Sequence, residues 1–92
     1  MDAVTFIGGM SVFAAGLCIA LGGLGSGIGE GNAAAQGLRA IAQQPDEAGS
    51  ITRTLFVSMA MIESTAIYSF VITILILYFN PFWTYAVETA AK

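Results

Sequence analysis

Two acidic residues, Glu30 and Glu63, stand inside stretches of sequence that are otherwise apolar. Glu63 is the single charged residue between Thr54 and Val87. A carboxylate in a membrane-length apolar segment is costly, so such residues generally face a bundle interior and handle ions or protons. The midpoint between Glu30 and Glu63 falls in the polar stretch around Pro45. A turn there would bring both carboxyl groups to the same height, and we expect them to form one site.

Hydroxyl groups follow Glu63 directly in the sequence. Ser64 and Tyr68 are four residues apart, so one face of a helix would carry both beside the carboxyl group. Cations such as Na⁺ take oxygen ligands, whereas a proton needs only the carboxyl group and one hydrogen-bonding partner. The surplus of oxygens favours a metal cation, although Ser64 and Thr65 could instead bond to carbonyls of the preceding turn. Two carboxylates in an apolar setting cannot both stay ionised without a cation, so the pair can carry one Na⁺ and one proton, or two protons.

The composition indicates a membrane protein. Hydrophobic residues make up 57% of the chain and charged residues 10%, against about a quarter charged in soluble domains. A soluble domain of 92 residues has too little interior to hide so much apolar surface. A chain with three basic residues cannot form a nucleic-acid-binding patch. With Cys18 as its one cysteine, a disulfide framework or a zinc site is excluded, and Cys18 is expected to be a small buried hydrophobe. Because the chain starts with Met1-Asp2-Ala3, acidic instead of basic, we do not expect a cleaved signal peptide.

Two long apolar segments separated by a polar stretch predict an all-α transmembrane hairpin. The first charge-free run, residues 3–29, exceeds the roughly 20 residues that a spanning helix needs. Lipid excludes unpaired backbone groups, which favours helices over strands. We expect one unit over residues 1–92, made of a helix over residues 3–41, a polar loop over 42–51, a helix over 52–79 and an interfacial segment over 80–92.

Basic and aromatic residues predict how the hairpin lies in the membrane. Arg39 and Arg53 flank the polar loop, and positive residues favour the cytoplasmic side. Phe82, Trp83 and Tyr85 form an aromatic group that is typical of a membrane interface. We therefore expect the loop on the cytoplasmic side and both termini outside.

Glycine occupies every second position near the end of the first apolar segment, at Gly23, Gly25, Gly27, Gly29 and Gly31. No strict GxGxxG pattern or following Gly-Lys-Ser/Thr is present, which excludes a phosphate-binding loop. On a helix, Gly23, Gly27 and Gly31 form one stripe, and Gly25 and Gly29 fall on nearly the opposite face. Separations of seven or fourteen residues from Gly23 add Gly9, Gly16 and Gly37 to the first stripe.

Opposed stripes of small residues predict a close helical neighbour on each side. Repeating such a contact head to tail closes a cylindrical ring of identical chains. The glycine-rich first helix would then form the inner ring. The second helix, rich in large aliphatic residues, would form the outer ring and face lipid.

Over nearly its whole length the chain resembles the rotor c subunit of F-type ATP synthases, and of the variant N-type enzymes. The resemblance rests on the alternating glycines, Gln44-Pro45, the run from Glu63 to Tyr68, and Asn80-Pro81-Phe82. It implies that Glu63 is the ion-carrying carboxylate of a sodium-type site with two carboxylates. In such a site Na⁺, or a proton instead, would be held by Glu63, Glu30, Ser64 and the backbone carbonyl of Met61, with Tyr68 beside them and Thr65 holding a water.

The resemblance also implies a non-catalytic membrane subunit without a cofactor, in the cytoplasmic membrane of a bacterium. Its partners would be identical c subunits in a ring, subunit a of the stator, the central stalk and membrane lipids. An arginine of the stator would pair with Glu63 when the site is empty, and the central stalk would contact Gln44-Pro45. Ring rotation would couple Na⁺ or H⁺ flux to ATP synthesis or hydrolysis elsewhere in the complex. One departure is Gln43, which stands where the family often has arginine.

Two other classes of protein are weighed against a rotor ring. A small multidrug-type cation/proton antiporter would also use a buried acid, but such transporters usually show more helices and a substrate cavity. A purely structural helical hairpin would not need the paired acids. Two helices with opposed glycine stripes favour the ring.

Overall fold

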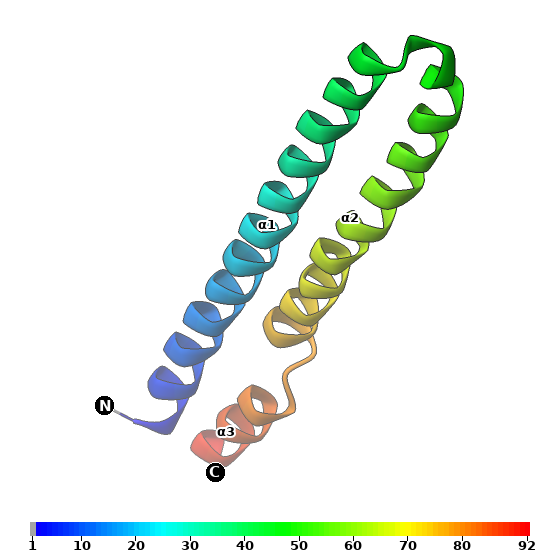
Figure 1. Ribbon diagram of the computed structural model, residues 1–92. Helices are drawn as coiled ribbons and strands as arrows, with labels where there is room; N and C mark the ends of the chain where they lie inside the picture. Colours follow the sequence, from blue (N-terminus) through cyan, green and yellow to red (C-terminus); the bar gives the residue numbers. More distant parts are fainter. Residues whose placement is uncertain (1) are drawn as a thin grey trace.

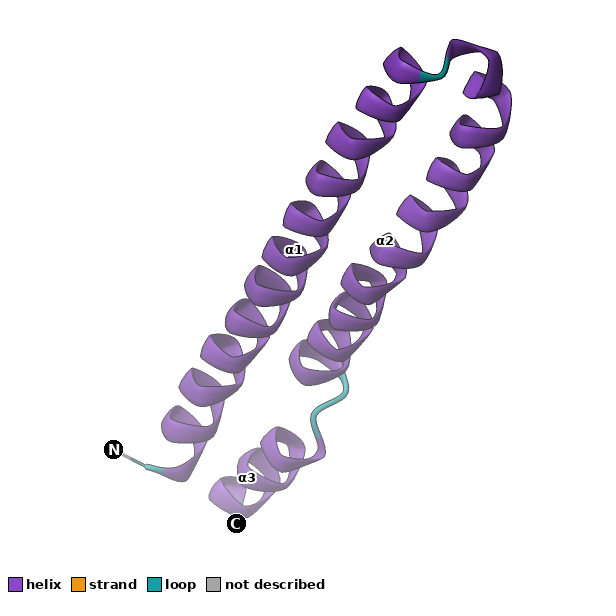
Figure 2. Cartoon of the chain, viewed as in Figure 1, coloured by secondary structure: helices purple, strands orange, loops and turns teal. Residues whose placement is uncertain are grey.

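The computed structural model describes residues 2–92, which form an all-α hairpin (Figures 1 and 2). Helix α1 (Ala3–Gln43) and helix α2 (Ala48–Tyr78) run antiparallel side by side, joined by the 3-10 turn η1 (Pro45–Glu47). Helix α3 (Pro81–Ala91) follows a break and lies beside the first turns of α1. We call Pro45–Ala91 the second arm of the hairpin.

Both arms are long and apolar enough to cross a membrane. The 41 residues of α1 correspond to about 60 Å of helix, about twice the thickness of a bilayer's hydrocarbon core. The hairpin is 71 Å long. At least one of its ends therefore extends beyond the hydrocarbon.

The turn between the arms is tighter than the loop expected over residues 42–51. Helix α1 ends at Gln43, because the next residue precedes a proline and is pushed out of helical geometry. Pro45 then takes the first position of the turn, and Asp46 and Glu47 follow in it. Proline and acidic residues are favourable at a helix start, where the dipole is positive. The second long helix therefore begins at Ala48 instead of near residue 52.

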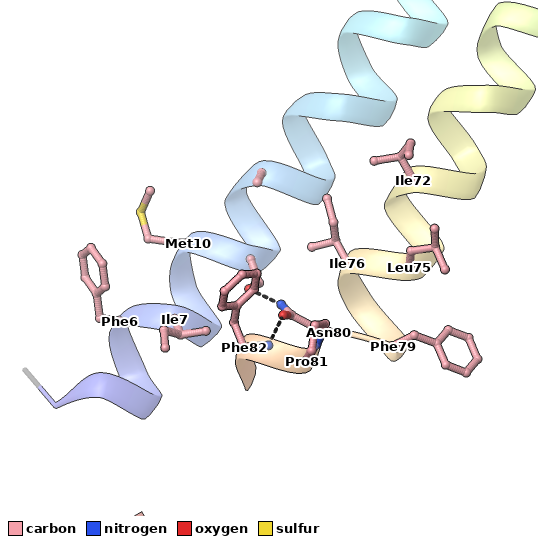
Figure 3. A pocket seen from close by; sticks show the side chains of 12 residues that line it. Phe6, Ile7, Met10, Ile72, Leu75, Ile76, Phe79, Asn80, Pro81 and Phe82 are labelled. Carbon is pink, nitrogen blue, oxygen red and sulfur yellow. Dashed lines mark hydrogen bonds between the residues drawn. The ribbon is translucent and has the colours of Figure 1, made fainter. Parts of the chain in front are cut away.

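Asn80 separates α2 from α3 and also attaches α3 to α1 (Figure 3). Its side-chain oxygen accepts hydrogen bonds from the backbone N–H groups of Phe82 and Trp83, at 3.0 and 3.3 Å, which caps α3. Its side-chain nitrogen donates to the Ser11 hydroxyl at 2.7 Å. The segment expected to be interfacial is thus a helix that continues the second arm along α1.

Two further features fix α3 against α1. A Cβ built on Gly8 would lie 2.7 Å from Cζ3 of Trp83, so the indole packs directly on the α1 backbone. Ala86 of α3 is buried, with 5% of its surface exposed. An open apolar groove of about 600 Å³ remains where α2 breaks, lined by side chains of all three helices and by Asn80 (Figure 3).

The residues buried between the arms are small or carry hydroxyl groups. Within residues 2–92 the buried positions are Ala15, Ser26, Thr73 and Ala86. The Thr73 hydroxyl is 3.3 Å from the carbonyl of Ala15 on the opposite arm and 2.8 Å from the carbonyl of Ser69 on its own helix. Because lipid is as apolar as leucine, helices in membranes associate through close packing and interhelical hydrogen bonds. The buried set matches that mode of association.

One stripe of α1 makes these contacts. Its members are three or four positions apart, which keeps them on one face of the helix: Ser11, Ala15, Cys18, Gly22, Ser26 and Gly29. The Cys18 thiol is half-buried and lies 3.5 Å from the carbonyl of Ser69. We call this set the α1 seam.

Apart from Gly8, which faces Trp83, the glycines divide into two groups by what they face. Gly22, Gly29 and Gly37 lie directly against side chains of α2, namely Ser69, Ile62 and Leu55. A Cβ built on any glycine of a second group would meet nothing within 4 Å: Gly9, Gly16, Gly23, Gly25, Gly27, Gly31 and Gly49. Gly37 was expected on the same stripe as Gly23, but Gly37 faces α2 and Gly23 is open. Gly29 was expected on the same stripe as Gly25, but Gly29 faces α2 and Gly25 is open. All of the open glycines except Gly49 lie on α1, where they leave backbone uncovered outside the seam.

Large apolar side chains cover the outside of the hairpin. Phe56, Tyr78, Phe79, Phe82 and Tyr85 each expose at least 70% of their surface. A surface this apolar requires lipid or protein around it.

We predict that Gly22→Ala opens the hairpin, because the added methyl group would overlap the Ser69 side chain. Overpacking of this kind costs about 1–3 kcal/mol. Trp83 is the one tryptophan of the chain and packs on α1, so its fluorescence reports the contact between the arms. A titration of the purified protein with a denaturing detergent should show a lower midpoint for the variant.

Gly49→Ala is the matched control, since its surroundings are open and it lies at the start of α2. Adding Ser69→Gly to Gly22→Ala removes the overlapping side chain and should restore much of the midpoint. Equal midpoints for Gly22→Ala and Gly49→Ala would contradict the packing described for the seam.

We predict that Asn80→Ala releases α3 more than Ser11→Ala does. The first change removes the cap and the bond to α1, whereas the second removes the bond alone. Loss of a helix cap costs about 1 kcal/mol, roughly a fivefold change in opening. Amide hydrogen exchange across α3 should therefore be fastest in Asn80→Ala, intermediate in Ser11→Ala and slowest in the unmodified chain; equal rates in both variants would show that the cap contributes nothing.

Candidate ion-binding site

The structure brings the two acidic residues of the apolar segments together. Glu30 lies on α1 and Glu63 on α2, and their carboxyl groups lie close enough to interact. Two carboxyl groups in this position can share a proton. Each arm therefore contributes one acid to a single site.

The register of the arms around this pair is set by Ile62, the residue before Glu63. A Cβ built on Gly29 would lie 3.2 Å from Cγ2 of Ile62, so the isoleucine packs against the α1 backbone at the glycine. The Ser26 hydroxyl is 3.3 Å from the Ile62 carbonyl. These two contacts hold the residues next to both acids against each other.

Ser26 also contacts the acid of its own helix. Its hydroxyl lies 3.2 Å from Oε1 of Glu30, one helical turn further along α1. Ser26 was not among the residues expected from the sequence. Two signals pointed to it: it is a hydroxyl residue within the glycine run, and it precedes Glu30 by four positions.

Two of the other expected ligands lie next to each other on α2. The Ser64 hydroxyl donates a hydrogen bond to the Met61 carbonyl, three residues earlier. This is the local use of a hydroxyl that the sequence left open as an alternative. It also leaves the lone pairs of the Ser64 oxygen free to meet a cation beside the carbonyl.

Thr65 and Tyr68 lie on the exposed part of α2. The side chain of Tyr68 is 68% exposed, and that of Thr65 is exposed as well. Within residues 2–92, no hydrogen bond joins either hydroxyl to the carboxyl pair. Gln44 and Pro45 lie at the turn, at the far end of the hairpin from the termini, and are exposed.

The chemistry of these groups suits a small cation or a proton. Two carboxyl groups, the Ser64 hydroxyl and the Met61 carbonyl supply oxygen atoms only, which suits a hard cation or a proton. The part of the chain that is described holds no cluster of three or more His, Cys, Asp or Glu side chains suited to a metal ion. Glu63 lies on the surface of the hairpin, where an ion can enter without passing through a closed cavity.

Comparisons with known proteins agree with the resemblance seen in the sequence. A family model for the C subunit of ATP synthase matches residues 13–76, more than half of the chain. The match includes both acidic residues of the site and the whole turn, and it ends before α3.

Curated relatives cover most of the chain. An ATP synthase c subunit of Cereibacter sphaeroides is 50% identical over 72 residues, which are 78% of this chain and 87% of the relative. The chloroplastic ATP synthase c subunit of Emiliania huxleyi is 47% identical over 76 residues, 83% of this chain and 93% of the relative. The ATP synthase c subunit of Prochlorococcus marinus is 45% identical over 82 residues, 89% of this chain and 99% of the relative.

Proposed function

Because the chain belongs to the C-subunit family of ATP synthases, we propose that it is an ion-carrying subunit of a rotor ring. The observation that carries the proposal is the close approach of Glu30 and Glu63 between two long apolar helices. A pair of acids in an apolar setting must hold protons or a cation to become neutral. That neutral, loaded state is what lets a ring subunit pass through lipid.

Na⁺ is the ion that the oxygens around Glu63 favour. One Na⁺ and one proton would neutralise the two carboxylates, with Ser64 and the Met61 carbonyl completing the shell on α2 and Thr65 holding a water. The number of oxygens near Glu63 supports this assignment, since a proton needs fewer. It requires that the Ser64 oxygen offer a lone pair to the ion while its hydrogen stays on the Met61 carbonyl. Two protons on the same pair give the proton-carrying alternative.

The ring would consist of identical copies with α1 inside and α2 outside. The open glycines of α1 support this arrangement, because Gly23, Gly27 and Gly31 meet nothing within their own hairpin. Small residues of this kind let a neighbouring helix approach closely. The large exposed side chains of α2 suit a lipid-facing outer layer.

Rotation of the ring would move each Glu63 past a stator subunit, where the ion leaves and another enters. A stator arginine would pair with Glu63 while the site is empty. Gln44 and Pro45, at the exposed turn, would contact the central stalk. The chain itself would act as a non-catalytic subunit, and residues 1–92 as a single hairpin unit.

The orientation follows from the charges near the turn. Arg39 and Arg53 lie close to it, so the turn would be cytoplasmic and the termini outside, in the inner membrane of a bacterium. The antiporter alternative gains no support from the relatives, which are named as ATP synthase subunits.

We predict that Glu63→Gln abolishes ion transport, whereas Glu30→Gln leaves a site that still works. Glutamine at position 63 cannot become charged, so it cannot exchange ions with the stator. At position 30 its carbonyl oxygen still faces Glu63. ATP-driven ion uptake into vesicles that hold the complete enzyme measures both variants, and total loss in Glu30→Gln would show that the two acids are equally essential.

We predict that Na⁺ protects Glu63 from modification by a carbodiimide near neutral pH. The reagent attacks the protonated carboxyl group, and a bound cation keeps that group ionised. Mass spectrometry of the labelled chain at a series of NaCl concentrations, with choline chloride as the ionic-strength control, measures the protection. Labelling that varies with pH but ignores Na⁺ would identify the proton-carrying alternative.

A further inference from the structure

Ser26 is a buried hydroxyl residue with an unusual pair of contacts. It exposes 4% of its surface and lies in the α1 seam. Hydroxyls in apolar helices commonly bond back to a carbonyl four residues earlier on the same helix. The Ser26 hydroxyl instead faces Oε1 of Glu30, four residues later, and the Ile62 carbonyl of the opposite arm, at 3.2 and 3.3 Å.

These contacts connect both halves of the ion site. Glu30 is the acid of α1, and Ile62 immediately precedes the acid of α2. Ser26 takes one of the acceptor sites of the Glu30 carboxyl group, which leaves the others for Glu63 and for a cation. A free glutamate side chain has several rotamers, and a hydrogen bond to one of its oxygens selects among them.

We propose that Ser26 is a positioning residue of the ion site, which acts by holding the Glu30 carboxyl group toward Glu63. The inference rests on the proposed ion-carrying function and adds a residue to it. Partners of this kind, which touch a ligand group and not the ion, typically change metal affinity 10- to 100-fold when removed.

A purely structural role is the competing explanation, and Thr73 allows it to be tested. Thr73 is also buried and its hydroxyl also reaches across to the other arm, at 3.3 Å from the Ala15 carbonyl. Its hydrogen bonds go to backbone carbonyls alone. Thr73→Val removes an interhelical hydrogen bond of a buried hydroxyl with almost no change of shape and does not touch Glu30, so it is the control for Ser26→Ala.

The test compares Ser26→Ala, Thr73→Val and the unmodified chain in membranes that contain the complete enzyme. Two quantities are measured at one fixed pH: the rate of carbodiimide labelling of Glu63 without Na⁺, and the NaCl concentration that halves this rate. We expect Ser26→Ala to raise the half-protecting concentration about tenfold and Thr73→Val, which only loosens the contact between the arms, to raise it much less. Equal values for Ser26→Ala and the unmodified chain, or equal shifts in both variants, would overturn the proposal.

A double-mutant cycle with Glu30→Ala shows whether Ser26 acts through Glu30. Ser26→Ala should change the Na⁺-free labelling rate of Glu63 when Glu30 is present and have no further effect when Glu30 is alanine. The same change in both backgrounds would assign Ser26 to helix packing. If Ser26→Ala does not assemble, Ser26→Cys replaces it, because cysteine has about the same size and is a weaker hydrogen-bond donor. Ser26→Cys should raise the half-protecting NaCl concentration by a smaller factor. The same concentration as in the unmodified chain would contradict the proposal.

Failure of the sodium assignment has a different signature. If Na⁺ does not protect Glu63 in the unmodified chain at any concentration, the site carries protons and the proposed ion is wrong. The Na⁺-free labelling rates then decide the role of Ser26 alone: a change that depends on Glu30 supports it, and no change overturns it.

Discussion

The close approach of two helices that gain little from hydrophobic burial is the constraint on which this hairpin depends. In lipid, apolar side chains are as well solvated outside a helix pair as inside it, so contact must come from small residues and hydrogen bonds. The α1 seam supplies both, with glycine at positions 22 and 29 and hydroxyls at 11 and 26. Small residues permit the contact, and the hydroxyls give it a register.

Register is what turns two isolated acids into a site. A shift of α2 by one turn would move Glu63 about 5.4 Å along the seam and separate it from Glu30. The packing of Ile62 on Gly29, together with the Ser26 contact, resists that shift. The cost of placing carboxyl groups in an apolar protein is thereby confined to one level of the hairpin, where the two acids can share a proton.

The sequence predicted the parts of the structure that depend on composition and on position along the chain. The length of the apolar runs predicted an all-α hairpin, and the near-equal distances of Glu30 and Glu63 from Pro45 predicted that the acids would meet. The sequence led us to expect a longer turn than the structure has. Pro45 and the acidic residues after it were interpreted as loop residues, although they also favour a helix start. The helical fold of residues 81–91 was missed for a similar reason, since Asn80-Pro81 ends one helix and caps the next.

Side-chain partners were harder to predict, because helical periodicity tells which residues share a face but not which face meets the other arm. Gly22 and Ser26 are not part of the pattern of alternating glycines, yet they belong to the α1 seam. Which glycines pack within the hairpin and which stay open depends on where α2 lies along α1, and the sequence pattern does not give this position.

Ion binding and helix packing are linked in this arrangement. A cation held by Glu30 and Glu63, as proposed, would bind to both arms at once and would have no such site when they separate, so it would stabilise their contact by mass action. The reverse holds equally, because any loosening of the seam lowers the fraction of chains with a complete site. The glycines and hydroxyls of the seam therefore influence ion affinity without touching the ion. A rotor subunit that is loaded and unloaded once per revolution would accordingly be stiffest between its arms while it carries its ion through lipid.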